Sequence, residues 1–173
     1  GGLNGKKMML LEFPDGAIPH GSDVACRMFA DQGVHWLIAH PERNKAVMRN
    51  PDIIKPFVDM GCMLQLTAAS VVGAFGRSAG QTAHTLLTRG LAHVVASDAH
   101  NLAHRPPRMG EARRYLSQHF GMGIAYRLTE ENPARILAER VAEPGGELPL
   151  AQPQQTTPAA APQGVIPQRM YAN

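Results

Sequence analysis

Short apolar runs recur along the chain and are separated by longer segments of mixed polarity. The runs are residues 7–13 (KMMLLEF), 34–39 (VHWLIA), 62–66 (CMLQL) and 93–96 (HVVA). Each is too short for a buried helix, and Pro14 and Pro41 end the first two. This pattern predicts buried β-strands.

The segments between these runs carry helix signals. Ser22 is a candidate N-cap for a helix that extends to Gln32 and stops at Gly33,. Asn50 and Pro51 mark the start of a second helix, which Gly61 would close,. Further helices are expected over residues 82–89, 108–120 and 133–140. Strand and helix alternate about every 25 to 30 residues, which is typical of βα units with parallel strands.

The composition changes near residue 141, where Pro, Gln, Ala and Thr replace the apolar pattern. We expect one α/β domain over residues 1–140 and a disordered tail over 141–173. Strand-like sequence begins within a few residues of Gly1. This start suggests a piece of a longer protein.

The formal net charge of +3 is scattered along the 173 residues rather than gathered into a basic stripe. That distribution favours a site for anions over a nucleic-acid surface. No apolar stretch reaches the roughly 20 residues of a membrane helix, and no signal peptide is visible. Cys26 and Cys62 lie in apolar contexts and are expected to be buried free thiols. A cytoplasmic protein is the simplest interpretation.

Polar residues fall where the predicted strands end. Glu12, His40, Asp98 and His100 close or follow the first, second and fourth strands, and Gln65 and Thr67 lie at the end of the third. In parallel βα folds the carboxyl ends of the strands form the active face. Carboxylates and imidazoles on one edge would suit Mn, Fe or Zn.

Each of these residues also has a structural explanation. Glu12 alone reads as a surface carboxylate, His40 as a turn histidine, and Asp98 as part of a turn. Their shared placement at successive strand ends favours a metal site. The remaining histidines do not share it and are expected to be structural or on the surface, although His104 flanks the site.

Arg43 and Arg105 stand beside the candidate ligands. A guanidinium group can donate hydrogen bonds to two phosphate oxygens at once and keeps its charge at all working pH values. These residues therefore indicate a phosphate substrate. The alternative is a pair of surface arginines bound to Glu42 or nearby acids. Neither cysteine begins the Cys-x5-Arg loop of a cysteine-dependent phosphatase.

The segments LLEFP, IAHPERN, HVVASDAHN, RPPRM and ENPARIL, in this order, resemble the second half of the PHP-type bacterial protein-tyrosine phosphatases of capsule and exopolysaccharide loci. The resemblance implies part of a distorted (β/α)7 barrel of TIM-like type, with outer helices and two or three divalent ions, commonly Mn²⁺, with Fe, Co or Zn as alternatives. It assigns metal-ligand positions to Glu12, His40, Asp98 and His100, and phosphate-binding positions to Arg43 and Arg105. The family's opening His-x-His motif has no counterpart here.

The implied function is hydrolysis of phosphotyrosine on a partner protein, such as a bacterial tyrosine autokinase. A PHP phosphatase for a small molecule such as histidinol phosphate or a nucleotide is one alternative. A partner-binding remnant without activity is the other. For the chain alone we expect weak metal binding, weak turnover and a tendency to form homo-oligomers through open sheet edges.

Overall fold

The computed structural model describes residues 7–101 and 107–138. Their framework is a four-stranded sheet in the order β1-β2-β3-β4, with every neighbouring pair parallel. The strands are β1 (Lys7–Leu11), β2 (Val34–Ala39), β3 (Met63–Thr67) and β4 (Val94–Ala96). Because they are parallel, all four carboxyl ends lie along one edge of the sheet.

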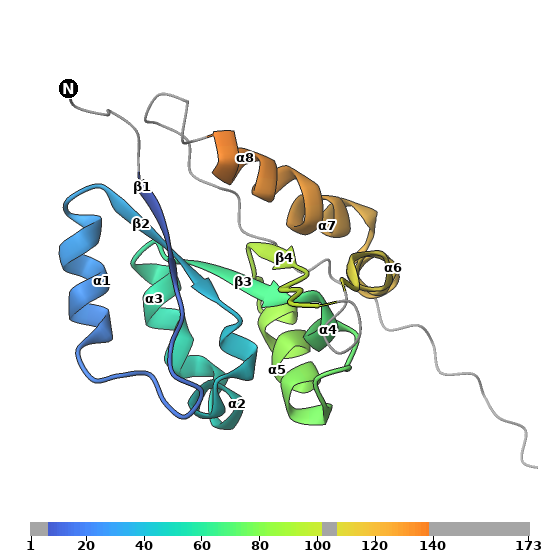
Figure 1. Ribbon diagram of the computed structural model, residues 1–173, viewed down its shortest axis with the longest axis horizontal. Helices are drawn as coiled ribbons and strands as arrows, with labels where there is room; N and C mark the ends of the chain where they lie inside the picture. The colour runs from blue at the N-terminus through green and yellow to red at the C-terminus, as the bar shows by residue number, and fades with distance from the viewer. Residues whose placement is uncertain (1–6, 102–106, 139–173) are drawn as a thin grey trace, which may run out of the picture.

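Helices connect the strands and cover the sheet (Figure 1). Helix α1 (Ser22–Ala30) packs on β2 and on α3 (Lys55–Asp59), while α3 also packs on β3. The short elements η1 (Pro41–Arg43), α2 (Lys45–Arg49) and η2 (Pro51–Ile54) follow β2. Between β3 and β4 come α4 (Ala68–Val71) and α5 (Arg77–Thr88), and α5 lies against η1 and α2.

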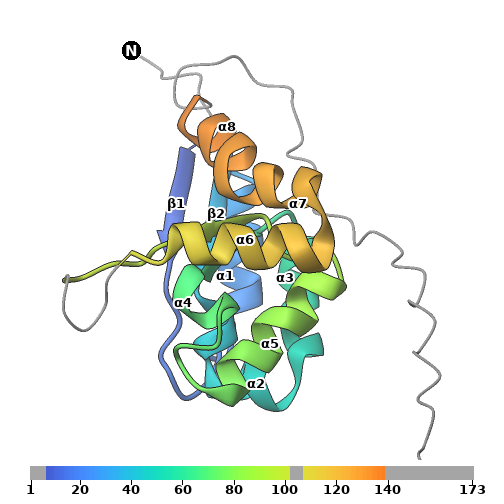
Figure 2. The same cartoon turned by 90° about the vertical axis from the view of Figure 1, so that its right-hand side faces the viewer.

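The last helices cover the β4 end of the sheet (Figure 2). They are α6 (Met109–Phe120), α7 (Met122–Tyr126), the π-helical turn η3 (Arg127–Glu131) and α8 (Asn132–Ala138). Both α6 and η3 contact β4. None of the helices in the described ranges is long and apolar enough to cross a membrane.

The core lies between the sheet and these helices. Strand residues Ile38, Leu64, Leu66 and Val95 are fully or almost fully buried, and they meet helix residues that include Leu86 of α5. The predicted α/β class with parallel strands is therefore confirmed. Burial also explains the near-continuous apolar character of β2, β3 and β4.

Three sequence predictions need correction. β1 is not a buried strand, because it lies at the edge of the sheet and Leu10 is 65% exposed. The α1 N-cap is Gly21, whose left-handed φ suits glycine, whereas Ser22 is the first helical residue,. Helix α5 starts at Arg77 rather than at residue 82, because its polar first turn hides the helical period. Residues 139–173 lie outside the described ranges, so the predicted tail and domain boundary stay predictions.

Candidate metal and phosphate site

Glu12 and His40 meet at the carboxyl edge of the sheet. Each directly follows its strand, β1 or β2, and the strands pair in register up to Leu11 and Ile38. His40 Nε2 lies 3.3 Å from Glu12 Oε1. Two ligands of one divalent ion, each about 2.0 to 2.2 Å from it, stand roughly 3 to 3.5 Å apart, so the carboxylate and imidazole fit a shared metal.

His40 and Asp98 share an uncommon backbone conformation. Among the described non-glycine residues they alone have positive φ, 34° for His40 and 48° for Asp98. Such conformations carry a local cost and concentrate at functional sites. Both residues follow strands whose carboxyl ends lie on the same edge, β2 for His40 and β4 for Asp98.

Arg43 links the β2 and β4 ends of this edge. Its Nη1 donates to Asp98 Oδ2 at 3.0 Å, and its guanidinium lies 4.7 Å from the centre of the Phe75 ring. Arg43 therefore pairs with Asp98 rather than with Glu42, the acid that the sequence offered as an alternative. The ion pair and the ring contact hold the guanidinium at the edge, where it retains donors for an anion.

His100 has the tautomer that suits a metal ligand. Its Nδ1 lies 2.9 Å from the backbone carbonyl oxygen of Asp98. Because a carbonyl only accepts, Nδ1 is the donor in this bond, which leaves Nε2 as the ring nitrogen available to a metal,. Metal-binding histidines commonly donate their other nitrogen to a carbonyl in this way.

Asn44 fixes the loop that carries Glu12. It is buried, its Oδ1 accepts from the backbone N–H of Ala46 and Val47, and its Nδ2 donates to Pro14 O at 2.7 Å. Next to it, Lys45 N donates to Asp15 O at 2.7 Å. One side chain thus caps α2 and fastens the segment after β1 beside the segment after β2.

Glu42, which the sequence offered only as a partner for the arginines, is a buried acid. Its Oε1 accepts from Thr67 N at 3.0 Å and so ties η1 to the end of β3. Burial raises the pKa of Glu42 to about 7, against the lowering effect of the Thr67 hydrogen bond. The Thr67 and Ser70 hydroxyl groups lie near the Glu42 carboxylate and also act to lower its pKa. The sequence signal was faint, since Glu42 stands between Pro41 and Arg43 in a polar turn.

The structure brings together some of the predicted residues. Glu12 pairs with His40, and Asp98 with Arg43, but no three His, Cys, Asp or Glu side chains in the described part of the chain are grouped closely enough to hold an ion. Arg105 and His104 lie outside the described residues, so the role expected of Arg105 stays a prediction.

Two other groups have structural roles. His93 is buried, its Nδ1 accepts from Leu64 N at 3.1 Å, and burial lowers its pKa to about 4. Cys26 and Cys62 are buried free thiols, as predicted, and burial raises the pKa of Cys62 to about 12. A thiol that stays protonated in the core is a poor nucleophile.

The fold and this edge define a parallel α/β protein with imidazole, carboxylate and guanidinium groups at its strand ends. A family model described as "Capsular polysaccharide synthesis, CpsB/CapC" matches residues 2–138. The chain belongs to this CpsB/CapC family, and the resemblance noted in the sequence is confirmed.

Named relatives agree with this assignment. The chain is 37% identical to tyrosine-protein phosphatase YwqE of Bacillus subtilis over 131 residues, which are 74% of this chain and 50% of YwqE. It is 36% identical to the putative tyrosine-protein phosphatase CapC of Staphylococcus aureus, over 61% of this chain and 41% of CapC. For CpsB of Streptococcus pneumoniae the identity is 34%, over 63% of this chain and 47% of CpsB. The chain thus spans about half the length of these relatives or less.

A solved structure shares the fold. Crystal structures of YwqE from B. subtilis and CpsB from S. pneumoniae are described as unique metal-dependent tyrosine phosphatases. The match has a TM-score of 0.73 and 30% identity, and it covers 87% of this chain and 59% of that chain.

Proposed function

We propose that this chain supplies the carboxyl-edge part of a metal-dependent phosphatase site that acts on phosphotyrosine. The observation that carries the proposal is the pairing of Glu12 with His40 at 3.3 Å beside the Arg43–Asp98 ion pair. Membership in the CpsB/CapC family and the names of its relatives support the reaction and the substrate class.

Glu12, His40, Asp98 and His100 are the proposed metal ligands, with Mn²⁺ as the proposed ion. A divalent ion bound there would act as a Lewis acid toward phosphate and would lower the pKa of a water molecule. Asp98 now pairs with Arg43. If Asp98 held a metal, the Arg43 guanidinium would be free to bind the phosphoryl oxygens and to stabilise their charge. Arg105 is proposed to share this task.

The proposed partner is a phosphotyrosine-bearing protein, in particular a bacterial tyrosine autokinase of capsule synthesis. A cytoplasmic location belongs to the same proposal. The two buried free cysteines support it, since reducing compartments keep thiols unpaired,.

The test is phosphate release by the protein in its complete natural form, with Mn²⁺ and after EDTA treatment. We expect metal-dependent hydrolysis of a phosphotyrosine peptide that is faster than that of a phosphoserine peptide or of histidinol phosphate. Arg43→Ala should lower kcat at least tenfold while metal content stays at the wild-type level, because the lost interaction is with the phosphoryl group. Faster turnover of histidinol phosphate would contradict the proposed substrate, and unchanged Arg43→Ala kinetics would contradict the role of Arg43.

A further inference from the structure

The loop between α4 and α5 carries a large aromatic side chain, Phe75, among small residues. Gly73, Ala74 and Gly76 surround it in the sequence. The guanidinium carbon of Arg43 lies 4.7 Å from the centre of the Phe75 ring. Because α4 directly follows β3, the segment that leads to this loop starts at the carboxyl edge of the sheet. Phe75 therefore stands beside the residue proposed to bind the phosphoryl group.

Backbone hydrogen bonds shape this loop. Gly73 N donates to Ser70 O at 2.9 Å, and Gly76 N donates to Gly73 O at 3.1 Å. Gly73 and Gly76 have φ values of 78° and 90°, which glycine adopts without strain,. The turn on both sides of Phe75 is thus defined by the backbone, and this turn presents the ring to Arg43.

Phe75 has no part in the hydrophobic core. Among the described residues it is neither a member of the core nor one of the apolar side chains packed against it, whereas Val72 of the same loop packs there. Phe75 is half-buried rather than enclosed. Aromatic side chains beside a few polar groups are typical linings of ligand sites. The position of Phe75 therefore suits contact with a ligand.

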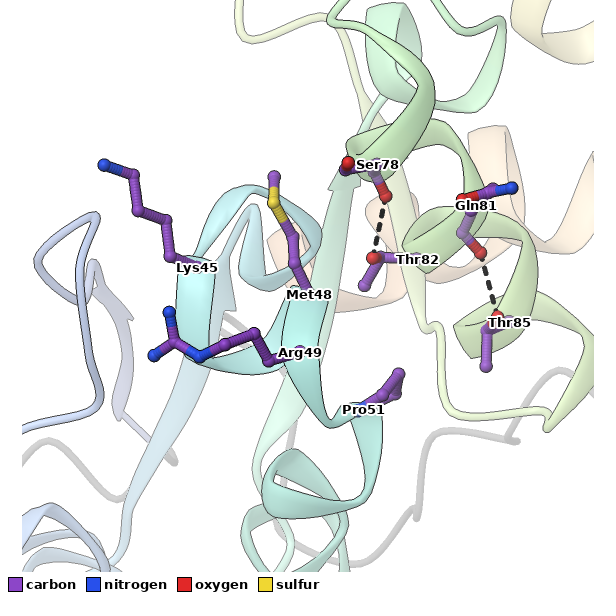
Figure 3. Close-up of a pocket in the computed structure, with 8 residues that line it drawn as sticks. All are labelled: Lys45, Met48, Arg49, Pro51, Ser78, Gln81, Thr82 and Thr85. Atoms are coloured by element: carbon purple, nitrogen blue, oxygen red, sulfur yellow. Dashed lines mark hydrogen bonds between the residues drawn. The ribbon is translucent and has the colours of Figure 1, made fainter.

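Of the cations on η1 and α2, Arg43 is the one shown in contact with this loop. Lys45 and Arg49 extend from α2 away from α5, the helix that begins directly after the loop (Figure 3). Arg43, by contrast, lies over the Phe75 ring. A phosphoryl group bound by Arg43 would therefore lie next to this ring.

The ring of a phosphotyrosine would then come close to Phe75. Arginine donates to phosphate oxygens at about 2.7 to 2.9 Å, and in phosphotyrosine a single ester oxygen separates the phosphorus atom from the aromatic ring. Since Arg43 is itself 4.7 Å from the centre of the Phe75 ring, the two rings can approach each other closely. Aromatic pairs prefer roughly 4.5 to 7 Å between ring centres. Phosphoserine has no ring and cannot make this contact.

We infer that Phe75 is a specificity-determining residue, whose ring contacts the phenyl ring of the substrate and favours aryl over alkyl phosphate esters. The inference rests on the proposed function for the position of the phosphoryl group. It adds a residue that distinguishes the ester group, whereas Arg43 would bind the phosphate that all such esters share. Phe75 acts through binding, because its side chain has no proton or charge to give to the reaction.

Binding of two phosphonates tests this inference without turnover. Phenylphosphonate and methylphosphonate carry the same anionic group, and only the first has an aromatic ring. Their Kd values are measured by calorimetry with the protein in its complete natural form, with Mn²⁺ and at a pH at which both are dianions. The wild type should bind phenylphosphonate about three- to tenfold more tightly, as expected for one aromatic pair.

Three variants of Phe75 separate the ring from the loop. Phe75→Ala should bring the ratio of the two Kd values to about one. Phe75→Leu keeps an apolar side chain in the loop and should still lower the ratio at least twofold, while Phe75→Tyr should keep the wild-type ratio. The control is Phe29→Ala, because Phe29 is 41% exposed and packs on Trp36 rather than on Arg43. This control should keep the wild-type ratio, and circular dichroism checks the folding of every variant.

The possible outcomes distinguish the role of Phe75 from the proposed phosphate site. A wild-type ratio near one would overturn the role of Phe75, as would a wild-type ratio that persists in both Phe75→Ala and Phe75→Leu. An equal loss of affinity for both phosphonates in these variants would also overturn it, since Phe75 would then act only by holding Arg43. No binding of either phosphonate to the wild type would contradict both proposals. Unchanged affinities in Arg43→Ala would count against the phosphate site alone, provided that Phe75→Ala still removed the preference.

Discussion

At the scale of single residues, His40 and Asp98 stand out because they alone among the described non-glycine residues have positive φ. Their positive φ values, 34° and 48°, place them where side chains other than glycine incur a local cost, on the order of 1 to 3 kcal/mol. The cost is tolerated at two strand ends that share one edge. The sequence predicted their position after the strands, but it could not predict the backbone conformation, because tertiary contacts determine it.

His93 should make stability depend on acidity. Its folded pKa is lowered to about 4 by burial, so the folded protein keeps it neutral while the unfolded chain binds a proton near pH 6.5,. The stability that depends on a neutral His93 is fully present above pH 6.5 and is lost as the pH falls through 4. The loss amounts to about 3 kcal/mol of the free energy of unfolding.

His93→Gln removes the titration but retains an acceptor for Leu64 N. The free energy of unfolding, measured in urea at pH 7.5 and pH 4.5, should therefore fall less for the variant than for the wild type, by about 2 to 3 kcal/mol. Equal losses in the two proteins would mean that His93 is not held neutral in the fold.

At the scale of elements, the apolar runs were sufficient to locate the strands. The predicted range 34–39 is the observed β2, and the other strands differ by one or two residues at their ends. Contacts that depend on polar turns were not predictable. Glu42 and Asn44 lie in a short polar segment whose letters do not reveal that both side chains are buried, or that they bond Thr67 and Pro14.

Asn44 offers a test of how η1 and α2 hold the edge together. Asn44→Ala removes the cap of α2 and the partly buried hydrogen bond to Pro14 O. We expect the free energy of unfolding to fall by about 2 kcal/mol, with roughly 1 kcal/mol from the lost cap and roughly 1 kcal/mol from the lost hydrogen bond. Urea unfolding measures this change.

Asn50→Ala is the matched control. Asn50 also caps a helical turn through Asp52 N, but it is exposed. The Asn50→Ala variant should therefore lose about 1 kcal/mol of stability or less. If both variants lost the same stability, the bond from Asn44 to the loop after β1 would contribute nothing.

At the scale of the whole molecule, β1 is the least covered part of the sheet. Among the described strands it pairs only with β2, and Met9 and Leu10 are 46% and 65% exposed. The apolar run gave no sign of this, because an edge strand and a buried strand can have the same composition. An exposed apolar edge invites pairing with another chain.

The 173-residue chain should therefore associate as its concentration rises, and Leu10→Lys should reduce that association. Sedimentation velocity measures the mean mass. The control is Met122→Lys, since Met122 is 81% exposed but lies on α7, away from β1. If Met122→Lys reduced association as much as Leu10→Lys, the association would be nonspecific and hydrophobic rather than mediated by the β1 edge.

The most direct measurement of the central claim locates Mn²⁺ on the folded chain. Paramagnetic broadening of amide NMR signals detects an ion even when the described residues bind it weakly, as expected for an edge with few grouped ligands,. Substoichiometric Mn²⁺ should broaden the signals of Glu12, His40 and Asp98 first, and His40→Ala should require more Mn²⁺ for the same effect. Broadening that begins elsewhere, for example at His84 and His119 on α5 and α6, or that ignores His40→Ala, would contradict a metal site at the carboxyl edge of the sheet.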